Sequence, residues 1–214
     1  MSRILIVGGH GKVALLLAPL LAARGDEVTS VIRDPAQAAD VDASGAVPLV
    51  LDVEHADVDA LAEALRGQDA VVWSAGAGGG DARRTTAVDR DAAIRTMDAA
   101  ARAGVDRYVM VSYLGAGPDH GVPADSSFHA YAEAKSAADA HLRETGLACT
   151  ILQPGPLTLE APTGLIETAD PGEGRVSRAD VAAVAAAVLA DPRTSRRTIA
   201  FGSGSTPIAD ALAR

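Results

Sequence analysis

The sequence predicts an α/β protein with a doubly wound parallel sheet, in a single domain with a small C-terminal extension. Two observations lead to this prediction. Short, mostly aliphatic runs bounded by Gly, Asp or Pro alternate along the chain with longer helical stretches. These runs are apolar at nearly every position, as in parallel strands whose two faces are both covered by helices. We place the domain over residues 1–214, with a substrate-side segment in residues 154–214.

The expected elements alternate between strand and helix. The strands are residues 3–7, 27–32, 47–51, 70–74, 107–112, 148–153 and 198–201. The helices are residues 11–23, 34–44, 58–65, 83–103, 128–145, 181–189 and 208–213. In the helix over 83–103, an apolar stripe at helical spacing comprises Ala87, Ile94, Met97 and Ala101. Ser177 is the expected N-cap of the next-to-last helix, and residues 157–174 form a loop-rich segment.

Composition and charge narrow the class of partner. A net charge of −9 leaves no Lys/Arg stripe to neutralise phosphates, so we expect a small-molecule substrate and no nucleic acid. The longest apolar run, 13–23, is shorter than the roughly 20 residues that span a bilayer, so no membrane partner is expected. The single Cys149 excludes an internal disulfide, which is typical of a cytoplasmic protein. Oligomeric state stays open.

The turn after the first strand has the pattern of a phosphate-binding loop. Its residues are Gly8, Gly9, His10, Gly11, Lys12, Val13 and Ala14. Glycines let the backbone approach a pyrophosphate, and the amides at the helix N-terminus stabilise its charge. A tight strand–helix turn without a ligand is the alternative reading. The strand before and the helix after the turn favour a dinucleotide site in a Rossmann-type fold.

The end of the second strand indicates which dinucleotide binds. NAD sites usually place an acid there for the ribose hydroxyl, whereas an Arg accommodates a 2′-phosphate. The first side chain past the apolar run is Arg33, whose planar guanidinium suits a phosphate. We therefore predict NADP as the cofactor, with NAD as the alternative. Asp34 either caps the next helix or takes the ribose, and Arg33 could also be a solvated surface charge.

Two further strand ends are candidates for the same cofactor. Asp52 and Val53 end the third strand, from which a side chain can reach the adenine edge; a turn cap is the alternative for Asp52. Ser74, Ala75 and Gly76 follow the fourth strand. Such small residues would let the backbone pass close to the nicotinamide ribose, although a plain glycine-rich loop has the same composition.

Tyr131 and Lys135 are four residues apart on one expected helix, so both side chains lie on the same face. A free phenol has a pKa of about 10, which is poor for proton transfer at neutral pH. A nearby ammonium lowers the pKa of a phenol by favouring the phenolate. Ser112 ends the fifth strand, and its hydroxyl could bind a carbonyl oxygen. These residues are candidates for acid–base chemistry, although an ordinary pair on a helix surface has the same spacing.

In their order along the chain, these motifs resemble the short-chain dehydrogenase/reductase superfamily, and in particular its compact atypical, NmrA-like or NAD(P)-binding members. The matching segments are Gly8-Gly9-His10-Gly11-Lys12-Val13-Ala14, Val31-Ile32-Arg33-Asp34-Pro35, Val109-Met110-Val111-Ser112, Tyr131-Ala132-Glu133-Ala134-Lys135, Thr150-Ile151-Leu152-Gln153-Pro154-Gly155-Pro156-Leu157 and Val176-Ser177-Arg178-Ala179-Asp180-Val181-Ala182. They cover nearly the whole chain.

The resemblance implies a role for each matching residue. Tyr131 is the expected acid–base catalyst, and Lys135 is expected to bind the nicotinamide ribose as well. Ser112 would orient the substrate carbonyl. Pro154 and Gly155, which follow the sixth strand, would lie beside the nicotinamide ring.

We therefore expect an NADP-preferring oxidoreductase that transfers a hydride to or from a small carbonyl or alcohol. One alternative is an NAD(P)H-binding redox sensor that contacts a protein partner without turnover. Another is an epimerase or dehydratase-like enzyme that uses the same groups. Gln153 stands where the family often has Arg, and the short chain after it leaves little room for the sugar-nucleotide pocket of extended members.

Substrate and metal sites are less well defined by the sequence. We expect the substrate pocket to be assembled from residues 114–127 and 157–174, whose irregular loops do not disclose its shape. The histidines His10, His120 and His129 show no metal-ligand spacing with Cys or carboxylates, so no metal is predicted.

Overall fold

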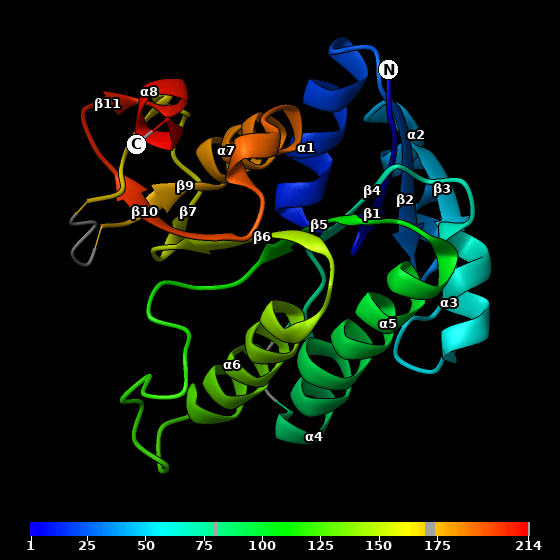
Figure 1. Cartoon of the computed structure of the whole chain (residues 1–214), viewed down its shortest axis with the longest axis horizontal. Helices are drawn as coiled ribbons and strands as arrows, with labels where there is room; N and C mark the ends of the chain where they lie inside the picture. Colours follow the sequence, from blue (N-terminus) through cyan, green and yellow to red (C-terminus); the bar gives the residue numbers. More distant parts are fainter. Residues whose placement is uncertain (79–80, 170–173, 214) are drawn as a thin grey trace.

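In the part of the chain that the structure describes, a nine-stranded sheet runs through the molecule. Its strands are β1 (Arg3–Val7), β2 (Glu27–Ile32), β3 (Val47–Val50), β4 (Ala70–Trp73), β5 (Arg107–Val111), β6 (Ala148–Pro154), β8 (Leu165–Glu167), β10 (Arg197–Ser203) and β11 (Thr206–Pro207). The computed structural model describes residues 1–78, 81–169 and 174–213. The strand order is β11-β8-β10-β6-β5-β4-β1-β2-β3, and every pair from β3 to β10 is parallel. The predicted doubly wound α/β fold is therefore confirmed (Figure 1).

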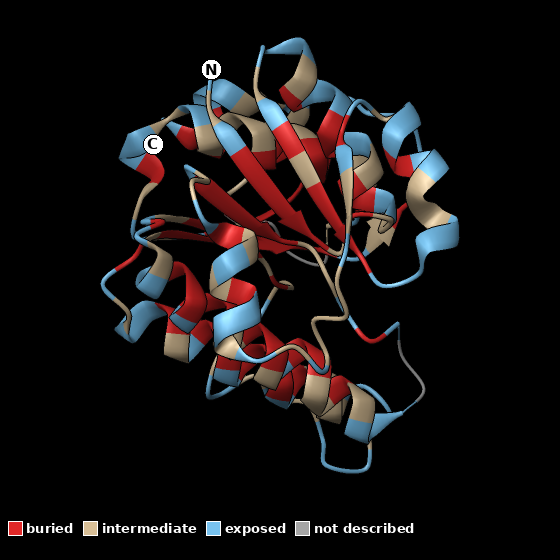
Figure 2. Cartoon of the chain, turned by 90° about the vertical axis from the view of Figure 1, so that its right-hand side faces the viewer, coloured by how far each residue is buried: buried red, intermediate tan, exposed pale blue. Residues whose placement is uncertain are grey.

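Helices cover both faces of this sheet. They are α1 (Lys12–Ala23), η1 (Pro35–Gln37), α2 (Ala38–Ala43), α3 (Val58–Leu65), α4 (Ala82–Thr85), η2 (Thr86–Ala92), α5 (Ala93–Ala103), α6 (His129–Glu144), α7 (Arg178–Ala190), η3 (Pro192–Thr194) and α8 (Ile208–Leu212). Helices α1, α2, α7 and α8 pack on one face, and α3, α5 and α6 pack on the other. Figure 2 shows the buried strands between these two layers, with the helices exposed on their outer sides.

Alternation along the strands builds a separate core on each face. In β1, Ile4 and Ile6 pack with α1 and α7, whereas Leu5 and Val7 pack with α3 and α5. Successive side chains of a strand point to opposite faces, so a strand that is apolar throughout is covered by helices on both faces of the sheet. Because β1 to β6 and β10 run parallel, their C-terminal ends lie at the same edge of the sheet.

The helix expected over 83–103 is interrupted by a π-helical segment, η2. Of the four residues expected to form its apolar stripe, Met97 alone is fully buried, and Asp89 is buried instead at 1% exposure. A π-turn winds more widely than an α-turn, so it shifts which positions face the core. The predicted stripe was wrong for this physical reason. π-Turns are frequent at functional sites.

The C-terminal segment is more regular than expected. The described residues of 157–174 contain two short strands, β7 (Leu157–Thr158) and β8, and β7 pairs with β9 (Val176–Ser177) in a small separate sheet. Strand β8 runs antiparallel to β10 and β11. Ser177 caps α7, as predicted, by accepting a hydrogen bond from the Asp180 backbone amide.

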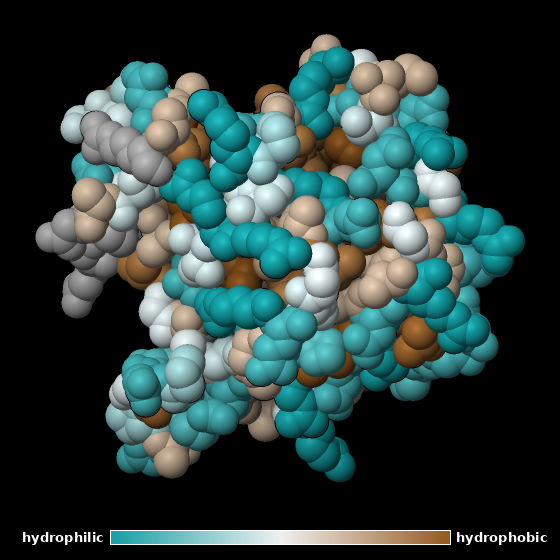
Figure 3. All heavy atoms as spheres, viewed as in Figure 1, coloured by the Kyte–Doolittle hydropathy of each residue, from teal (hydrophilic) through white to brown (hydrophobic). Residues whose placement is uncertain are grey.

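The surface in Figure 3 is mainly hydrophilic, with hydrophobic side chains set between and beneath the polar ones. Among the described residues, none of the helices combines the length and apolar character needed to cross a membrane.

Candidate cofactor and active site

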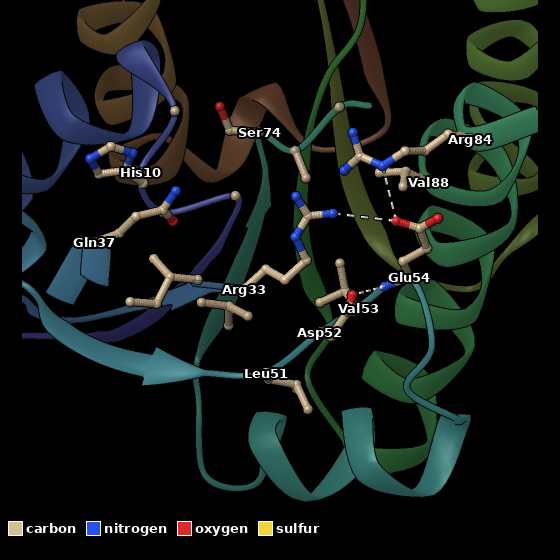
Figure 4. Close-up of a pocket in the computed structure, with 17 residues that line it drawn as sticks. His10, Arg33, Gln37, Leu51, Asp52, Val53, Glu54, Ser74, Arg84 and Val88 are labelled. Atoms are coloured by element: carbon tan, nitrogen blue, oxygen red, sulfur yellow. Dashed lines mark hydrogen bonds and ion pairs between the residues drawn. The ribbon is translucent and has the colours of Figure 1, made fainter. Parts of the chain in front are cut away.

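A cleft opens at the C-terminal ends of β1, β2, β3 and β4, with a volume of about 260 Å³. This edge, where the chain crosses from one half of the sheet to the other, is the place where open α/β sheets bind ligands. The sequence-predicted residues that line the cleft are Gly8, Gly9, His10, Gly11, Arg33, Asp52, Val53, Ser74, Ala75 and Gly76. Four loops that are distant in sequence therefore meet around one cavity (Figure 4).

The glycines of the first loop are required by close backbone packing. Gly8 has φ +85°, and a Cβ there would lie 2.6 Å from the Ala75 backbone. A Cβ on Gly9 would lie 2.5 Å from the Ser30 side chain. The loop is thus pressed against β2 and β4, and its backbone forms the floor of the cleft.

The N-terminus of α1 faces this floor. Its N-cap, Gly11, provides no side-chain hydrogen bond to the first helical turn, and the first helical bond of this turn runs from Leu15 N–H to the Gly11 carbonyl, 2.9 Å. The amides before Leu15 therefore have no intrahelical acceptor, which is the arrangement that binds phosphates. The cradle and the free helix end together fit a dinucleotide pyrophosphate.

Three charged side chains lie together at the far end of the cleft. Arg33 Nη1 is 3.6 Å from Glu54 Oε2, and Arg84 Nε is 3.1 Å from the same oxygen. Both guanidinium groups reach toward this carboxylate from different elements (Figure 4). Arg33 is the most exposed of the three, with 56% of its side chain in solvent.

Two acids near this group have local roles in turns. Asp34 accepts a hydrogen bond from Ala36 N at 2.9 Å and caps η1. Asp52 accepts from Glu54 N at 3.1 Å and pairs with His55, which holds the turn after β3. The capping alternatives for both residues are thus seen in the structure, although Asp52 also lines the cleft.

Several predicted residues lie outside the cleft lining. Lys12 is exposed at the start of α1, and Val13 is buried in the core beneath it. Pro154 and Gly155 are buried beside β10, where Gly155 N–H donates to the Phe201 carbonyl at 2.9 Å.

Behind the cleft, Lys135, Asp139, Asp89 and Ser112 form a buried charged group that we call the Lys135 cluster. Lys135 is 1% exposed, and its ammonium donates to the Val111 carbonyl at 2.7 Å. Ser112 Oγ donates to Asp139 Oδ2 at 2.7 Å, so its hydroxyl is engaged within the protein. Ala77 N–H donates to Asp89 Oδ2 at 2.9 Å. One oxygen of each aspartate has no hydrogen-bond partner among the described residues.

The electrostatics of this cluster differ from the expected pattern. Burial raises the pKa of Asp89 and of Asp139, although Lys135 acts in the opposite direction. Burial lowers the pKa of Lys135, and the two carboxylates oppose that shift. Burial also raises the pKa of Tyr131, and the charges of Asp89 and Asp139 raise it further. In the free protein the pKa of Tyr131 is therefore shifted in the direction opposite to the one expected from Lys135, because burial and the two carboxylates dominate.

Gly76 and Asp89 connect the cleft to this cluster. Gly76 lines the cleft, and a Cβ on it would meet the free Oδ1 of Asp89 at 3.0 Å. Val88, the neighbour of Asp89 in η2, also lines the cleft. Since Asp89 acts electrostatically on both Tyr131 and Lys135, the acid–base candidates lie just behind the Gly76 end of the cleft.

A second cavity, of about 580 Å³, has Tyr131 in its wall. It is lined by the start of α4, by Ala124 and by residues 126–131. The Tyr131 ring packs against Phe128 and Tyr113, with centroids 5.1 and 5.6 Å away. Of the two loops expected to form the substrate pocket, 114–127 contributes to this cavity, whereas the described residues of 157–174 (157–169 and 174) do not line it.

A family model described as NAD(P)H-binding matches residues 8–192 of the chain, which include the cleft and the Lys135 cluster. The chain belongs to this NAD(P)H-binding family. It is 34% identical over 213 residues to the uncharacterized sugar epimerase YhfK of Bacillus subtilis (strain 168), with 98% of each chain covered.

Solved structures of similar proteins share the fold of this NAD(P)H-binding chain over its whole length. A putative NAD-dependent epimerase/dehydratase from Bacillus halodurans is 32% identical, with a TM-score of 0.92 and coverage of 100% of this chain and 99% of that one. The oxidoreductase ylbE from Lactococcus lactis is 29% identical, with a TM-score of 0.88 and coverage of 99% and 95%. The family resemblance drawn from the sequence motifs is thereby confirmed.

Sequence reasoning missed four charged residues of this NAD(P)H-binding protein, namely Glu54, Arg84, Asp89 and Asp139. Asp139 had a usable signal, because it follows Lys135 by four residues on the same helix face. The other three meet their partners only through long-range packing, which no local spacing reveals.

The structure also brings together His120, His129 and Glu133, whose candidate ligand atoms lie within 4.8 Å of one another. Val122 N–H donates to His120 Nδ1, so Nε2 of His120 carries the proton and donates to Glu133 at 2.8 Å. That nitrogen has no lone pair free for a metal ion. His129 Nδ1 forms a hydrogen bond with the Val122 carbonyl at 3.0 Å, so each histidine has a hydrogen-bond partner within the protein.

Proposed function

We propose that this protein is an NADP-preferring oxidoreductase that interconverts a small carbonyl compound and its alcohol. The observation that carries the proposal is the contact between the cleft and the Lys135 cluster at Gly76 and Asp89. A nicotinamide cofactor bound in the cleft would supply or accept the hydride. The residues of this chain would hold the cofactor, orient the substrate oxygen and move its proton.

The cofactor would be held mainly by backbone. Gly8 and Gly9 let the first loop pack closely against Ala75 and Ser30, and this packing places its backbone as a cradle for a pyrophosphate at the N-terminus of α1, where free amides stabilise negative charge. Arg33 supports the preference for NADP, because its exposed guanidinium lies in the cleft and suits a 2′-phosphate. Ser74, Ala75 and Gly76 would pass close to the nicotinamide ribose.

Tyr131 would exchange the proton with the substrate oxygen. Carbonyl reduction requires the protonated phenol, which is the form present at neutral pH, although the raised pKa makes Tyr131 of the free protein a weaker acid than a free phenol. The second cavity beside Tyr131 has the volume of a small-molecule pocket. In this proposal Lys135 and Ser112 position the site: Lys135 holds the Val111 carbonyl, and Ser112 fixes Asp139.

Replacement of Tyr131 by Phe tests the acid–base role. Turnover of a panel of small carbonyl compounds with NADPH, followed by cofactor absorbance, should fall about a hundredfold or more. The dissociation constant of NADPH should change little, because the hydroxyl is not part of the proposed cofactor cradle. Tyr113→Phe is the matched control, since it removes a phenol hydroxyl from the adjoining ring. Equal turnover in parent and Y131F would refute the role, and no turnover in the parent would favour a sensor.

Arg33→Ala tests the choice of cofactor separately. The parent should bind NADP more tightly than NAD, and the variant should lose most of that difference. Calorimetric titration with each nucleotide measures both constants. A parent that binds NAD and NADP equally, or a variant that keeps the full preference, would contradict the assignment of NADP.

An epimerase that oxidises and re-reduces its substrate is the second candidate. Two relatives, 34% and 32% identical, carry epimerase in their names. Such an enzyme would use the same proton and hydride positions but would show no net consumption of cofactor. Inversion of a substrate stereocentre without a change in cofactor absorbance would select this candidate over the reductase.

A further inference from the structure

Glu54 lies between two arginines inside the cofactor cleft. Its Oε2 is 3.6 Å from Arg33 Nη1 and 3.1 Å from Arg84 Nε. Arg33 follows β2, Glu54 follows β3 and Arg84 belongs to α4, so three separate elements bring these charges together. The carboxylate carries the one negative charge in this group, and it is shared by both guanidinium groups.

The backbone around Glu54 is held firmly. Arg95 of α5 donates hydrogen bonds to the carbonyls of Val53, Glu54 and Ala56, at 3.1, 2.8 and 3.1 Å. Asp52 caps the same turn through the Glu54 amide. A change at this site would therefore involve the Glu54 side chain, and the turn that carries it would stay in place.

Arg84 is also anchored while its charge remains accessible. Its Nη1 donates to the Ala77 carbonyl at 2.6 Å, and 35% of its side chain is exposed. Arg84 and Arg33 both line the cleft, so a ligand there can reach either guanidinium. Only 17% of the Glu54 side chain is exposed, so it is the least exposed of the three.

We propose that Arg33 and Arg84 together form the subsite for the 2′-phosphate of NADP, and that Glu54 occupies this subsite as an internal competitor. The proposal rests on the NADP preference argued above and adds two residues that determine it. The 2′-phosphate and the Glu54 carboxylate would compete for the same two cations. Glu54 thus weakens the preference for NADP that the two arginines create.

The charges explain why competition is expected. A phosphate monoester carries about −1.5 to −2 charges at neutral pH, and bidentate contacts to guanidinium groups are among the stronger polar interactions. With Glu54 in place, the two arginines offer a net charge of +1 instead of +2. A nucleotide without the 2′-phosphate gains nothing from either arginine, so NAD affinity should be insensitive to Glu54.

Calorimetric binding of adenosine 2′,5′-bisphosphate and of 5′-AMP tests the proposal without any catalysis. In Glu54→Gln, affinity for the bisphosphate should rise about fivefold or more, because a like charge near the phosphate is removed. In Arg84→Ala it should fall about tenfold or more, the usual loss when a charge-assisted hydrogen bond is removed. Binding of 5′-AMP should be unchanged in both. Arg83→Ala, next to Arg84 but outside the cleft lining, is the matched control and should behave as the parent does.

The gain expected for Glu54→Gln keeps the test independent of folding, since a damaged protein would not bind more tightly. Unchanged or weaker bisphosphate binding in Glu54→Gln, or an Arg84→Ala variant equal to Arg83→Ala, overturns the proposal. Failure of the proposed NADP preference looks different. If the parent has no NADP preference, it would bind adenosine 2′,5′-bisphosphate and 5′-AMP equally. Glu54→Gln would then create a preference for the bisphosphate if the subsite exists. If Glu54→Gln created none, the subsite proposal would fall as well.

Discussion

The cofactor cleft and the Lys135 cluster both combine cations with carboxylates, but they do so in opposite environments. In the cleft, Arg33 is 56% exposed and meets Glu54 at the solvent edge. In the cluster, Lys135 is 1% exposed beside Asp89 and Asp139. The exposed charges remain available to a ligand, whereas the buried ones chiefly set the pKa values and positions of their neighbours. This difference in solvent exposure supports the binding role proposed for the cleft and the positioning role proposed for the cluster.

The largest effect is expected from removing the buried cation. Lys135→Met leaves Asp89 and Asp139 without the positive charge that offsets their burial. Loss of one member of a buried charged group costs about 4 kcal/mol. The free energy of unfolding, measured by guanidinium chloride denaturation, should fall by this amount. Lys12→Met, at an exposed position, should change it by less than about 0.5 kcal/mol. Equal stability of the two variants would mean that Lys135 does not hold the cluster together.

The same contrast explains what the sequence could predict. Arg33 is the first residue after a strand, and the glycines lie in a strand–helix turn. Both positions can be recognised from local sequence, so the cleft was largely predictable. The partners of Lys135 were not. Asp89 reaches the cluster through the π-turn η2, which shifts the helix face that a regular period predicts. The direction of the Tyr131 pKa shift was missed because it depends first on burial and then on carboxylates contributed by two helices.

A second test asks whether the cleft depends on backbone packing. Gly8→Ala combines a positive φ with a Cβ 2.6 Å from the Ala75 backbone. We expect a loss of about 3 kcal/mol in the free energy of unfolding, from backbone strain together with overpacking. Gly25→Ala isolates the strain, because its φ is +89° and its Cβ would meet nothing within 4 Å. It should cost about 1–2 kcal/mol. Equal losses in the two variants would show that contact with Ala75 is unimportant.

The pH dependence of the free energy of unfolding tests the raised pKa of Asp139 in the Lys135 cluster. The folded-state pKa of Asp139 is raised by burial, so its contribution to stability is fully present below the unfolded pKa of about 3.9 and is lost as pH rises through the folded pKa. Asp139→Asn removes this titration and keeps an acceptor for Ser112 Oγ. The stability of the variant relative to the parent should therefore increase as the pH rises from acid to neutral, as measured by urea denaturation. Glu144→Gln, exposed on the same helix, is the control for the loss of a carboxyl group. A pH-independent difference for Asp139→Asn would contradict the raised pKa.

The smallest effect on stability is expected from Arg33→Ala. Its guanidinium is more than half exposed, and its ion pair with Glu54 spans 3.6 Å at the solvent edge. Pairs of this kind contribute about 0–1 kcal/mol, because solvent screens the charges and two long side chains must be ordered. Thermal denaturation should thus barely distinguish the variant from the parent, while NADP binding weakens. A loss comparable to that of Lys135→Met would show that Arg33 supports the fold, and the division between a binding region and a buried positioning region would not hold.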